Sequence, residues 1–113
     1  MVDQSTGTLD GVFAAISDPT RRAILRHLGR RPARVTDIAS RFPLSLNAVS
    51  KHLLVLQRAG LVRQEVRGRE RICSLQGRAL RNASAWIEGM REVWEGRLDA
   101  LERRIAAKRA KRR

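Results

Sequence analysis

The chain has 113 residues, 42% of them hydrophobic, which is enough for one modest core and too little for two ordinary domains. Its 24 Lys and Arg residues outnumber 11 Asp and Glu, and the net charge of +13 favours a polyanionic partner, nucleic acid before an anionic membrane surface. No apolar run reaches the roughly 18 residues of a membrane-spanning helix, the start lacks a signal-peptide pattern, and the single cysteine cannot form an intrachain disulfide. We therefore expect a cytoplasmic protein with no membrane partner and no cofactor.

The positive charge is concentrated in two segments. Residues 21–71 hold 13 basic and 3 acidic residues, and residues 103–113 hold seven basic residues and no acidic one. A basic terminal run is usually a solvated tail, so the central segment is the better candidate for a nucleic-acid surface. The predicted organisation is an N-terminal arm (1–8), one domain (9–105) and a basic C-terminal tail (106–113).

The first two predicted helices meet at Asp18. One covers residues 9–17, and the next covers residues 20–28, with Asp18 as N-cap and Pro19 at the first position, where a missing amide costs little. The following segment, GRRPAR, is expected to be a loop.

A helix-turn-helix is predicted next. Thr36 can cap a short helix over residues 37–42, and Pro43 forces a turn. Ser45 can cap a second helix over residues 46–59, which Gly60 ends.

After Gly60 the hydrophobic period changes from helical to alternating. Residues 61–67 and 71–75 predict a β-hairpin with its turn at residues 68–70. The residues expected to face inward are Val62, Val66, Cys73 and Leu75.

The last predicted helix, over residues 78–107, is longer than a small domain is wide. The pairs Arg91/Glu95 and Asp99/Arg103 are spaced to form ion pairs along it. An apolar stripe that runs past its own domain needs cover, and a second copy is the simplest cover, so we expect a homodimer. The stripe consists of Leu80, Ala83, Ile87, Met90, Trp94, Leu98, Leu101 and Ile105.

The helix over residues 46–59 starts with polar residues and ends with apolar ones. A helix that enters the major groove with its first turns needs short side chains there, and groups that pair with base edges. Asn47 can pair with adenine and Lys51 with guanine or a phosphate; an ordinary cap and a solvated face is the alternative. The predicted DNA contacts of this helix are Ser45, Asn47, Ala48, Ser50, Lys51 and His52, of which His52 has a packing role as its alternative.

Three arginines, Arg67, Arg69 and Arg71, surround Gly68 at the hairpin tip. Arginines on a projecting ribbon suit phosphates or a narrow minor groove, whereas protection of a sheet edge from aggregation is the alternative. Because the hairpin directly follows the polar helix, we predict that these arginines contact DNA, together with Arg34 of the same basic segment.

Several short motifs follow one another over about residues 9–101. They are Asp18-Pro19-Thr20-Arg21-Arg22, Ile24-Leu25, Val49-Ser50-Lys51-His52-Leu53, Leu56, Ala59-Gly60-Leu61-Val62 and Gly68-Arg69. In this combination the chain resembles the ArsR-type winged helix-turn-helix repressors of bacteria.

The resemblance implies a mainly α fold with a small β-hairpin wing, an α+β winged helix-turn-helix with five helices in the order ααααββα. It also implies a dimer formed by the first and last helices, with the helix of residues 45–59 in the groove of double-stranded DNA and the wing of residues 67–71 beside it. The expected dimer residues are Leu9, Val12, Phe13, Ile16, Trp86, Ile87, Met90, Trp94, Leu98 and Leu101.

The chain departs from the metal-sensing members of that family. Those members place two cysteines on the helix before the recognition helix, whereas residues 36–42 contain none here. His27 and His52 both lie outside the last helix, so a zinc site there is disfavoured, and no metal is predicted. An unknown small-molecule effector stays open, with a pocket near Trp86 and Trp94 as an alternative to dimer packing. Cys73 is expected to act as a small hydrophobe rather than a redox sensor.

The sequence therefore predicts a DNA-binding transcriptional regulator, a repressor that binds an inverted-repeat operator as a homodimer. The alternative is a non-specific architectural DNA- or RNA-binding protein driven by the basic tail. No enzyme is predicted, because paired carboxylates, a nucleophile triad and a glycine-rich phosphate loop are all missing.

Overall fold

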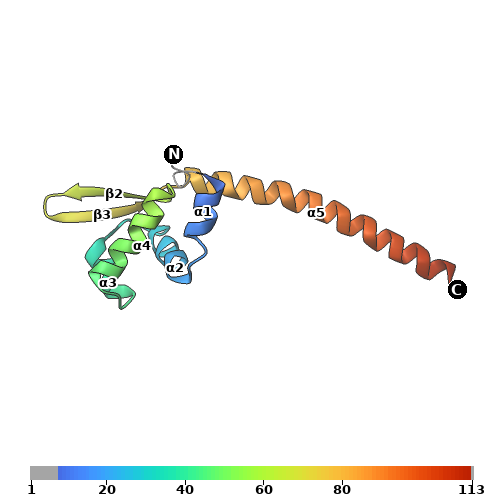
Figure 1. Ribbon diagram of the computed structural model, residues 1–113, viewed down its shortest axis with the longest axis horizontal. Coiled ribbons are helices and arrows are strands. Elements are labelled where there is room, and N and C mark those ends of the chain that lie inside the picture. Colours follow the sequence, from blue (N-terminus) through green and yellow to red (C-terminus); the bar gives the residue numbers. More distant parts are fainter. Residues whose placement is uncertain (1–7, 113) are drawn as a thin grey trace. The chain divides into compact units, whose positions relative to one another are not determined.

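A computed structural model describes residues 8–112, in two compact units that divide between residues 83 and 84. The first unit holds four helices, three strands and the first turns of a fifth helix, and the second holds the rest of that helix (Figure 1). The predicted mainly α winged class with five helices is confirmed. The elements are α1 (Leu9–Ala15), α2 (Pro19–Leu28), β1 (Ala33–Arg34), α3 (Val35–Arg41), α4 (Leu46–Arg58), β2 (Val62–Arg67), β3 (Glu70–Leu75) and α5 (Arg78–Lys111).

Side-chain caps fix where three of the helices begin. The backbone N–H of Arg21 donates to Asp18 Oδ2 (2.9 Å), and that of Ala48 donates to Ser45 Oγ (3.1 Å), so both predicted caps are confirmed. Thr8 caps α1 in the same way, through the N–H of Gly11 (3.0 Å). The rest of the predicted N-terminal arm, residues 1–7, lies outside the described residues.

The start of α3 differs from the prediction. Thr36 lies inside the helix, which begins at Val35 after Arg34 and has no side-chain cap. The reason is the preceding strand: Ala33 pairs with Cys73 and Arg34 with Ile72, so the backbone is already fixed up to the residue before the helix. The segment predicted as a loop therefore contains β1, which makes the sheet three-stranded in the order β1-β3-β2.

Glycines end α4 and turn the hairpin. Gly60 has a φ of 78°, and the N–H groups of Gly60 and Leu61 donate to the carbonyls of Gln57 (3.0 Å) and Leu56 (2.9 Å), which closes the helix in a Schellman motif. In the hairpin Arg67 pairs with Glu70, so the turn has two residues rather than the three predicted. Gly68 has a φ of 62°, as the first central position of a type II′ turn requires.

The core of the first unit lies between α1 to α4 and the base of the sheet. Val62 and Cys73 are buried as predicted, and Leu75 packs against the core. Val66 is 70% exposed, so its predicted inward position is wrong: it has the correct strand phase but lies where the hairpin has passed beyond the core. The largest fully buried side chains are Ile24, Ile38, Leu53, Leu56, Leu61, Val12, Val49, Val62 and Cys73.

The first turns of α5 contribute to the core of the first unit, and the rest of the helix forms the second unit. Ala79 and Ala83 are buried, whereas Leu80, which was expected to begin the apolar stripe, is exposed. The helix extends to Lys111, four residues past its predicted end at residue 107. No helix within residues 8–112 is long and apolar enough to cross a membrane.

Candidate nucleic-acid interface

The first turns of α4 are exposed and polar, although the same helix is anchored by buried side chains. Asn47 and Lys51 are exposed, whereas Val49 and Leu53 are fully buried. The helix-turn-helix packs α4 against α3, and the backbone N–H of Leu44 donates to the Ala39 carbonyl (3.1 Å) to close the connection. The start of α4 is therefore held rigidly while its polar side chains face solvent.

The predicted contact residues of this helix differ in exposure. Ser45, Asn47 and Lys51 are exposed, whereas Ala48, Ser50 and His52 are half-buried. The helix N-terminus carries partial positive charge and free backbone N–H groups, which suit an anion such as a phosphate.

Leu46 was not singled out from the sequence. It shares the helical face of Val49 and Leu53, so periodicity would bury it, yet it is 53% exposed at the first position of α4. The signal that could have found it is its place next to the Ser45 cap, in the turn where a recognition helix meets its ligand.

The hairpin projects from the helices of its unit (Figure 1). Val66 and Arg71 are register partners on the strand face that bears Cys73, but beyond the core. An Arg71 guanidinium N–H donates to Ser50 Oγ of α4 at 3.5 Å, a long hydrogen bond. The structure therefore brings together the wing and the polar helix, two features that are separate in the sequence.

Arg34 lies among acidic side chains rather than free in solvent. Its guanidinium forms ion pairs with Asp37 (3.3 Å) and with Glu70 at the wing turn (2.8 Å). Of the three wing arginines, Arg67 forms a longer ion pair with Glu65 (3.5 Å). Arg69 and Arg71 form no ion pair with any acidic group in the described part of the chain.

Two titratable groups near this region have shifted pKa values. The hydrogen bond from the Arg21 backbone N–H lowers the pKa of Asp18 below its ordinary value of 3.8. Burial opposes this shift to a smaller extent, and electrostatic interactions with the Arg21 and His52 side chains add to it. Burial raises the pKa of Cys73 above its ordinary value of 9.0, against the opposing charge of Arg71. A thiol held in its neutral form is a poor nucleophile.

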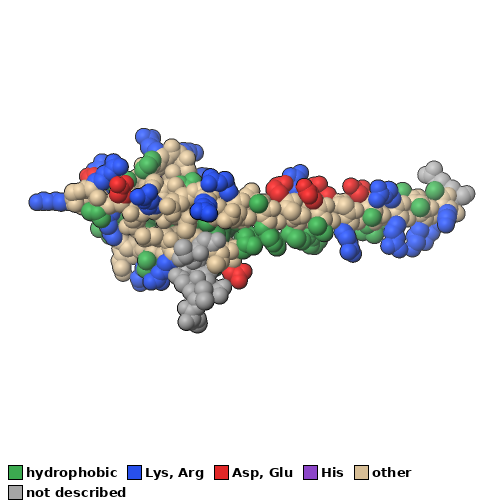
Figure 2. All heavy atoms as spheres, turned by 90° about the horizontal axis from the view of Figure 1, so that it is seen from above, with side chains coloured by type: hydrophobic (Ala, Val, Ile, Leu, Met, Phe, Trp, Pro, Cys, Tyr) green, Lys and Arg blue, Asp and Glu red, His purple; other side chains and the backbone are tan. Residues whose placement is uncertain are grey.

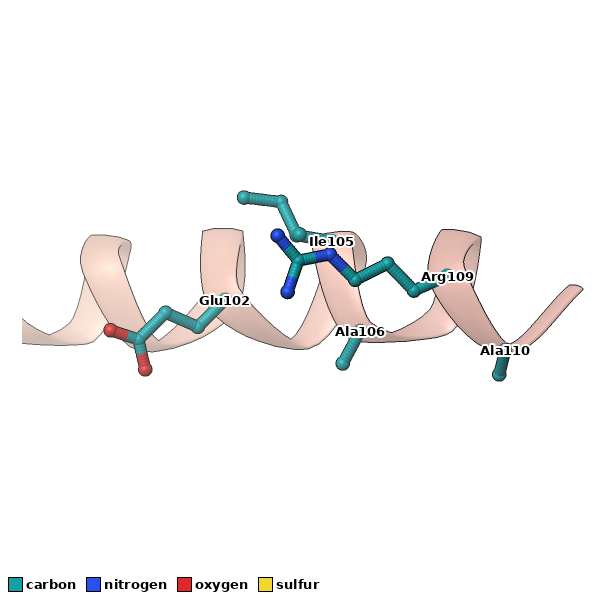
Figure 3. Close-up of a pocket in the computed structure, with 5 residues that line it drawn as sticks. All are labelled: Glu102, Ile105, Ala106, Arg109 and Ala110. Atoms are coloured by element: carbon teal, nitrogen blue, oxygen red, sulfur yellow. The ribbon is translucent and has the colours of Figure 1, made fainter. Parts of the chain in front are cut away.

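No group of three or more His, Cys, Asp or Glu side chains within residues 8–112 could hold a metal ion. The hollow lined by Glu102, Ile105, Ala106, Arg109 and Ala110 has walls from one helix only, as Figure 3 shows. It lacks the enclosure by several elements that small-molecule sites have.

The predicted dimer residues fall into two groups. On α1, Val12 is buried within its own chain, and the other three, Leu9, Phe13 and Ile16, pack against the same core while partly exposed. On α5, Met90 is half-buried, and the exposed members are Trp86, Ile87, Trp94, Leu98 and Leu101. Figure 2 shows hydrophobic side chains gathered along one edge of the extended helix and acidic side chains along the opposite edge.

The helix α4 is anchored in the core and has an exposed polar start. A short helix precedes it, and an arginine-tipped hairpin follows it. Together these features define a winged helix-turn-helix DNA-binding protein.

Comparison with known proteins identifies the family. Residues 16–65 match the helix-turn-helix domain family. The chain is 35% identical over 79 residues to the transcriptional repressor SdpR of Bacillus subtilis, an alignment that covers 70% of this chain and 88% of the relative. Among solved structures, an ArsR-like transcriptional regulator from Rhodococcus sp. RHA1 has a TM-score of 0.72 at 39% identity, over 84% of this chain and 90% of that one. The ArsR family regulator RHA00566 has the same TM-score of 0.72 at 38% identity, over 77% and 96%.

The chain belongs to the ArsR family of winged helix-turn-helix transcriptional regulators. It is accordingly a DNA-binding regulator of transcription and not an enzyme.

Proposed function

We propose that the protein is a homodimeric repressor that binds an inverted-repeat operator, with the start of α4 in the major groove and the wing beside it. The observation that carries this proposal is the division of α4, in which Asn47 and Lys51 are exposed on a helix fixed by buried Val49 and Leu53. A rigid helix that offers hydrogen-bonding groups at its start is what base readout needs.

Each exposed group at the start of α4 matches a feature of DNA. The amide of Asn47 can pair bidentately with adenine, and the Lys51 ammonium can donate to guanine O6 and N7. The exposed Leu46 side chain offers an apolar contact to a thymine methyl. Ser45 lies at the helix N-terminus, where a phosphate is electrostatically favoured.

The wing supplies contacts that depend less on sequence. Arg67, Arg69 and Arg71 are exposed, and the hydrogen bond from Arg71 to Ser50 ties this ribbon to the start of α4. Arginine on such a ribbon suits phosphates or the narrow minor groove. The α4 start and the wing together can therefore read one half-site.

A second copy supplies the second half-site. The apolar side chains of Ile87, Trp94, Leu98 and Leu101 lie exposed on one side of α5, which is a costly surface to leave in water. Two copies related by a two-fold axis present two recognition helices, so the operator is an inverted repeat with half-sites about one helical turn, or a multiple, apart. SdpR, which is a transcriptional repressor by name, supports repression as the outcome of binding.

The test begins with selection of bound sequences from random duplex DNA. Asn47→Ala and Lys51→Ala should each relax the selected sequence and lower operator affinity by about 1–3 kcal/mol for each base pair that is no longer read. Gln57→Ala is the matched control, because Gln57 is exposed on the same helix about 15 Å from Asn47 along its axis. If the two α4 variants select the same operator as the wild type, the helix assignment is wrong.

Arg69→Ala distinguishes the wing from the helix. It should weaken binding to all sequences. It should also reduce the slope of log affinity against log salt concentration by about 0.9, which is the value for one phosphate contact. If the variant instead changed the sequence preference, Arg69 would contact base edges rather than phosphates.

An architectural nucleic-acid binder is the second candidate, favoured by the basic C-terminal segment. Deletion of residues 106–113 separates the two. A repressor keeps its preference for the operator over random DNA, whereas an architectural binder loses most of its binding.

A further inference from the structure

The C-terminal end of α5 is basic and helical. The helix continues to Lys111, and from Arg103 onward the described chain contains cations and alanines but, apart from Ile105, no other kind of side chain. No acidic residue follows Glu102. The described cations of this basic end are Arg103, Arg104, Lys108, Arg109, Lys111 and Arg112, all exposed.

The apolar stripe of α5 changes into a basic stripe at this end. Leu101 and Ile105 are followed, at the same alternation of four and three residues, by Lys108 and Arg112. A second copy aligned in parallel along the stripe would bring these cations against their own counterparts, which is repulsive. In that arrangement the surface that a second copy can cover ends at about Ile105.

The cations of the basic end lack acidic partners. Within residues 8–112, the ion pairs of α5 join Arg91 to Glu88 and Glu95, and none includes a residue after 102. The predicted pair between Asp99 and Arg103 is not formed, whereas the predicted Arg91–Glu95 pair is (2.9 Å). Like charges four residues apart, such as Arg104, Lys108 and Arg112, destabilise a helix. An external polyanion would therefore stabilise this part of α5.

The acidic side chains of a second copy do not serve as this external polyanion. The acids of α5 lie on the edge opposite the apolar stripe (Figure 2). A copy that docks through its apolar stripe would therefore turn its acids away from the contact.

We propose that residues 103–112 form a phosphate-binding surface for double-stranded DNA, which adds sequence-independent affinity to the base readout by α4. The segment is about 14 Å long as a helix, and duplex DNA carries about eight phosphate charges over that length, enough for all six cations. The inference rests on the DNA-binding function of the family, not on the operator or the repression.

Two full-length variants test this surface. The neutral variant replaces Lys108, Arg109, Lys111 and Arg112 with Gln, and the matched control exchanges Lys for Arg and Arg for Lys at the same four positions. All of these residues are good helix formers, so circular dichroism should show equal helix content. The measurement is the affinity for a random-sequence duplex between about 50 and 200 mM salt, together with the sedimentation of each protein.

The expected result is a salt slope reduced in the neutral variant by about 0.9 for each phosphate that is no longer bound, up to about 3.6 for four. The wild type would then lose up to about 150-fold more affinity than the neutral variant over this salt range, and the control would match the wild type. Preference for the selected operator over random DNA should stay the same.

A slope within 0.9 of the wild type would overturn the proposal, since the neutral variant would then bind as many phosphates as the wild type. So would a change in sedimentation confined to the neutral variant, because the basic end would then hold copies of the protein together. Loss of binding to single-stranded RNA with duplex binding unchanged would assign the surface to RNA. Each of these results leaves the base readout by Asn47 and Lys51 untouched.

Discussion

The guanidinium of Arg34 lies 2.8 Å from the Glu70 carboxylate, and this ion pair joins the short strand β1 to the turn of the wing. The two residues are 36 positions apart in the chain, and the pairing of β1 with β3 brings them together. Asp37, on the first turn of α3, approaches the same guanidinium at 3.3 Å. Arg34 is therefore a cation already neutralised by acidic groups of the protein, one of them at the turn of the wing proposed to bind DNA.

Glu70→Gln should strengthen DNA binding. Both partners are about half exposed, so the loss of the pair should change the free energy of unfolding by no more than about 1 kcal/mol. The variant removes an acid beside the arginines of the wing and leaves Arg34 paired with Asp37 alone. One further phosphate contact, made by Arg34 or by a wing arginine, should steepen the log–log salt slope by up to about 0.9. The measurement is affinity for random and selected duplexes across a salt series.

Glu92→Gln is the control for this change, because it removes the same charge from an exposed position on α5. An equal gain in affinity from both variants would show that net charge alone is responsible, and not the Arg34–Glu70 pair.

The helices, their caps at Asp18 and Ser45 and the helix-turn-helix could be predicted because each depends on residues close in the sequence. The strand β1 could not, since two residues carry no period and form a strand only by pairing with β3. Val66 and Leu46 have the correct phase to be buried and are exposed, because phase does not tell where along an element the core ends.

The same distinction between local and long-range features applies to the candidate site. The sequence placed polar residues on α4 and arginines on the wing, but their connection through Arg71 and Ser50 depends on tertiary structure. The neutralisation of Arg34 by Glu70 likewise needs a long-range contact, so a pattern of basic residues could not distinguish Arg34 from Arg69.

Leu53→Ala should destabilise the first unit strongly. Leu53 is fully buried between the helices, and removal of such a side chain leaves a cavity that costs about 2–5 kcal/mol. Leu54→Ala is the matched control, since Leu54 is the next residue on the same helix and is 44% exposed, and it should change stability by about 0.5 kcal/mol or less. Urea unfolding followed by circular dichroism measures both. Similar midpoints for the two variants would contradict the assigned orientation of α4.

Protonation of Asp18 should lower the free energy of unfolding in acid. Its pKa is lowered in the folded chain by the hydrogen bond from the Arg21 N–H, so the carboxylate stabilises the fold above its ordinary pKa of 3.8. That contribution is lost as the pH falls from 3.8 through the lower pKa of the folded state. Asn is also a good N-cap but does not titrate, so Asp18→Asn should make the urea midpoint less dependent on pH below 3.8. Parallel midpoint curves for wild type and variant in this range would show that Asp18 does not titrate as assigned.

Cys73 should resist thiol reagents in the folded protein. It is fully buried in the core on the central strand β3, and burial raises its pKa, so both access and the thiolate fraction are low. Labelling should be at least about 100-fold slower than for the unfolded chain, because it requires opening of the core. The comparison is Val66→Cys in a Cys73→Ala background, whose thiol would lie on the same face of the sheet but beyond the core. Equal labelling rates at the two positions in native buffer would refute the burial of Cys73.

Leu98→Glu should separate the two copies of the proposed dimer. Leu98 is 51% exposed on the apolar stripe of α5, so the substitution leaves the first unit folded but places a carboxylate in the surface that a second copy would cover. Dimer affinity should fall at least about tenfold, and operator affinity should fall with it, because a monomer can occupy only one half-site. Ala85→Glu introduces the same side chain at an exposed position off the stripe and should leave both unchanged. Sedimentation at several concentrations measures the first effect and duplex titration the second. If Leu98→Glu sediments as the wild type does, the apolar stripe is not the surface through which the copies meet.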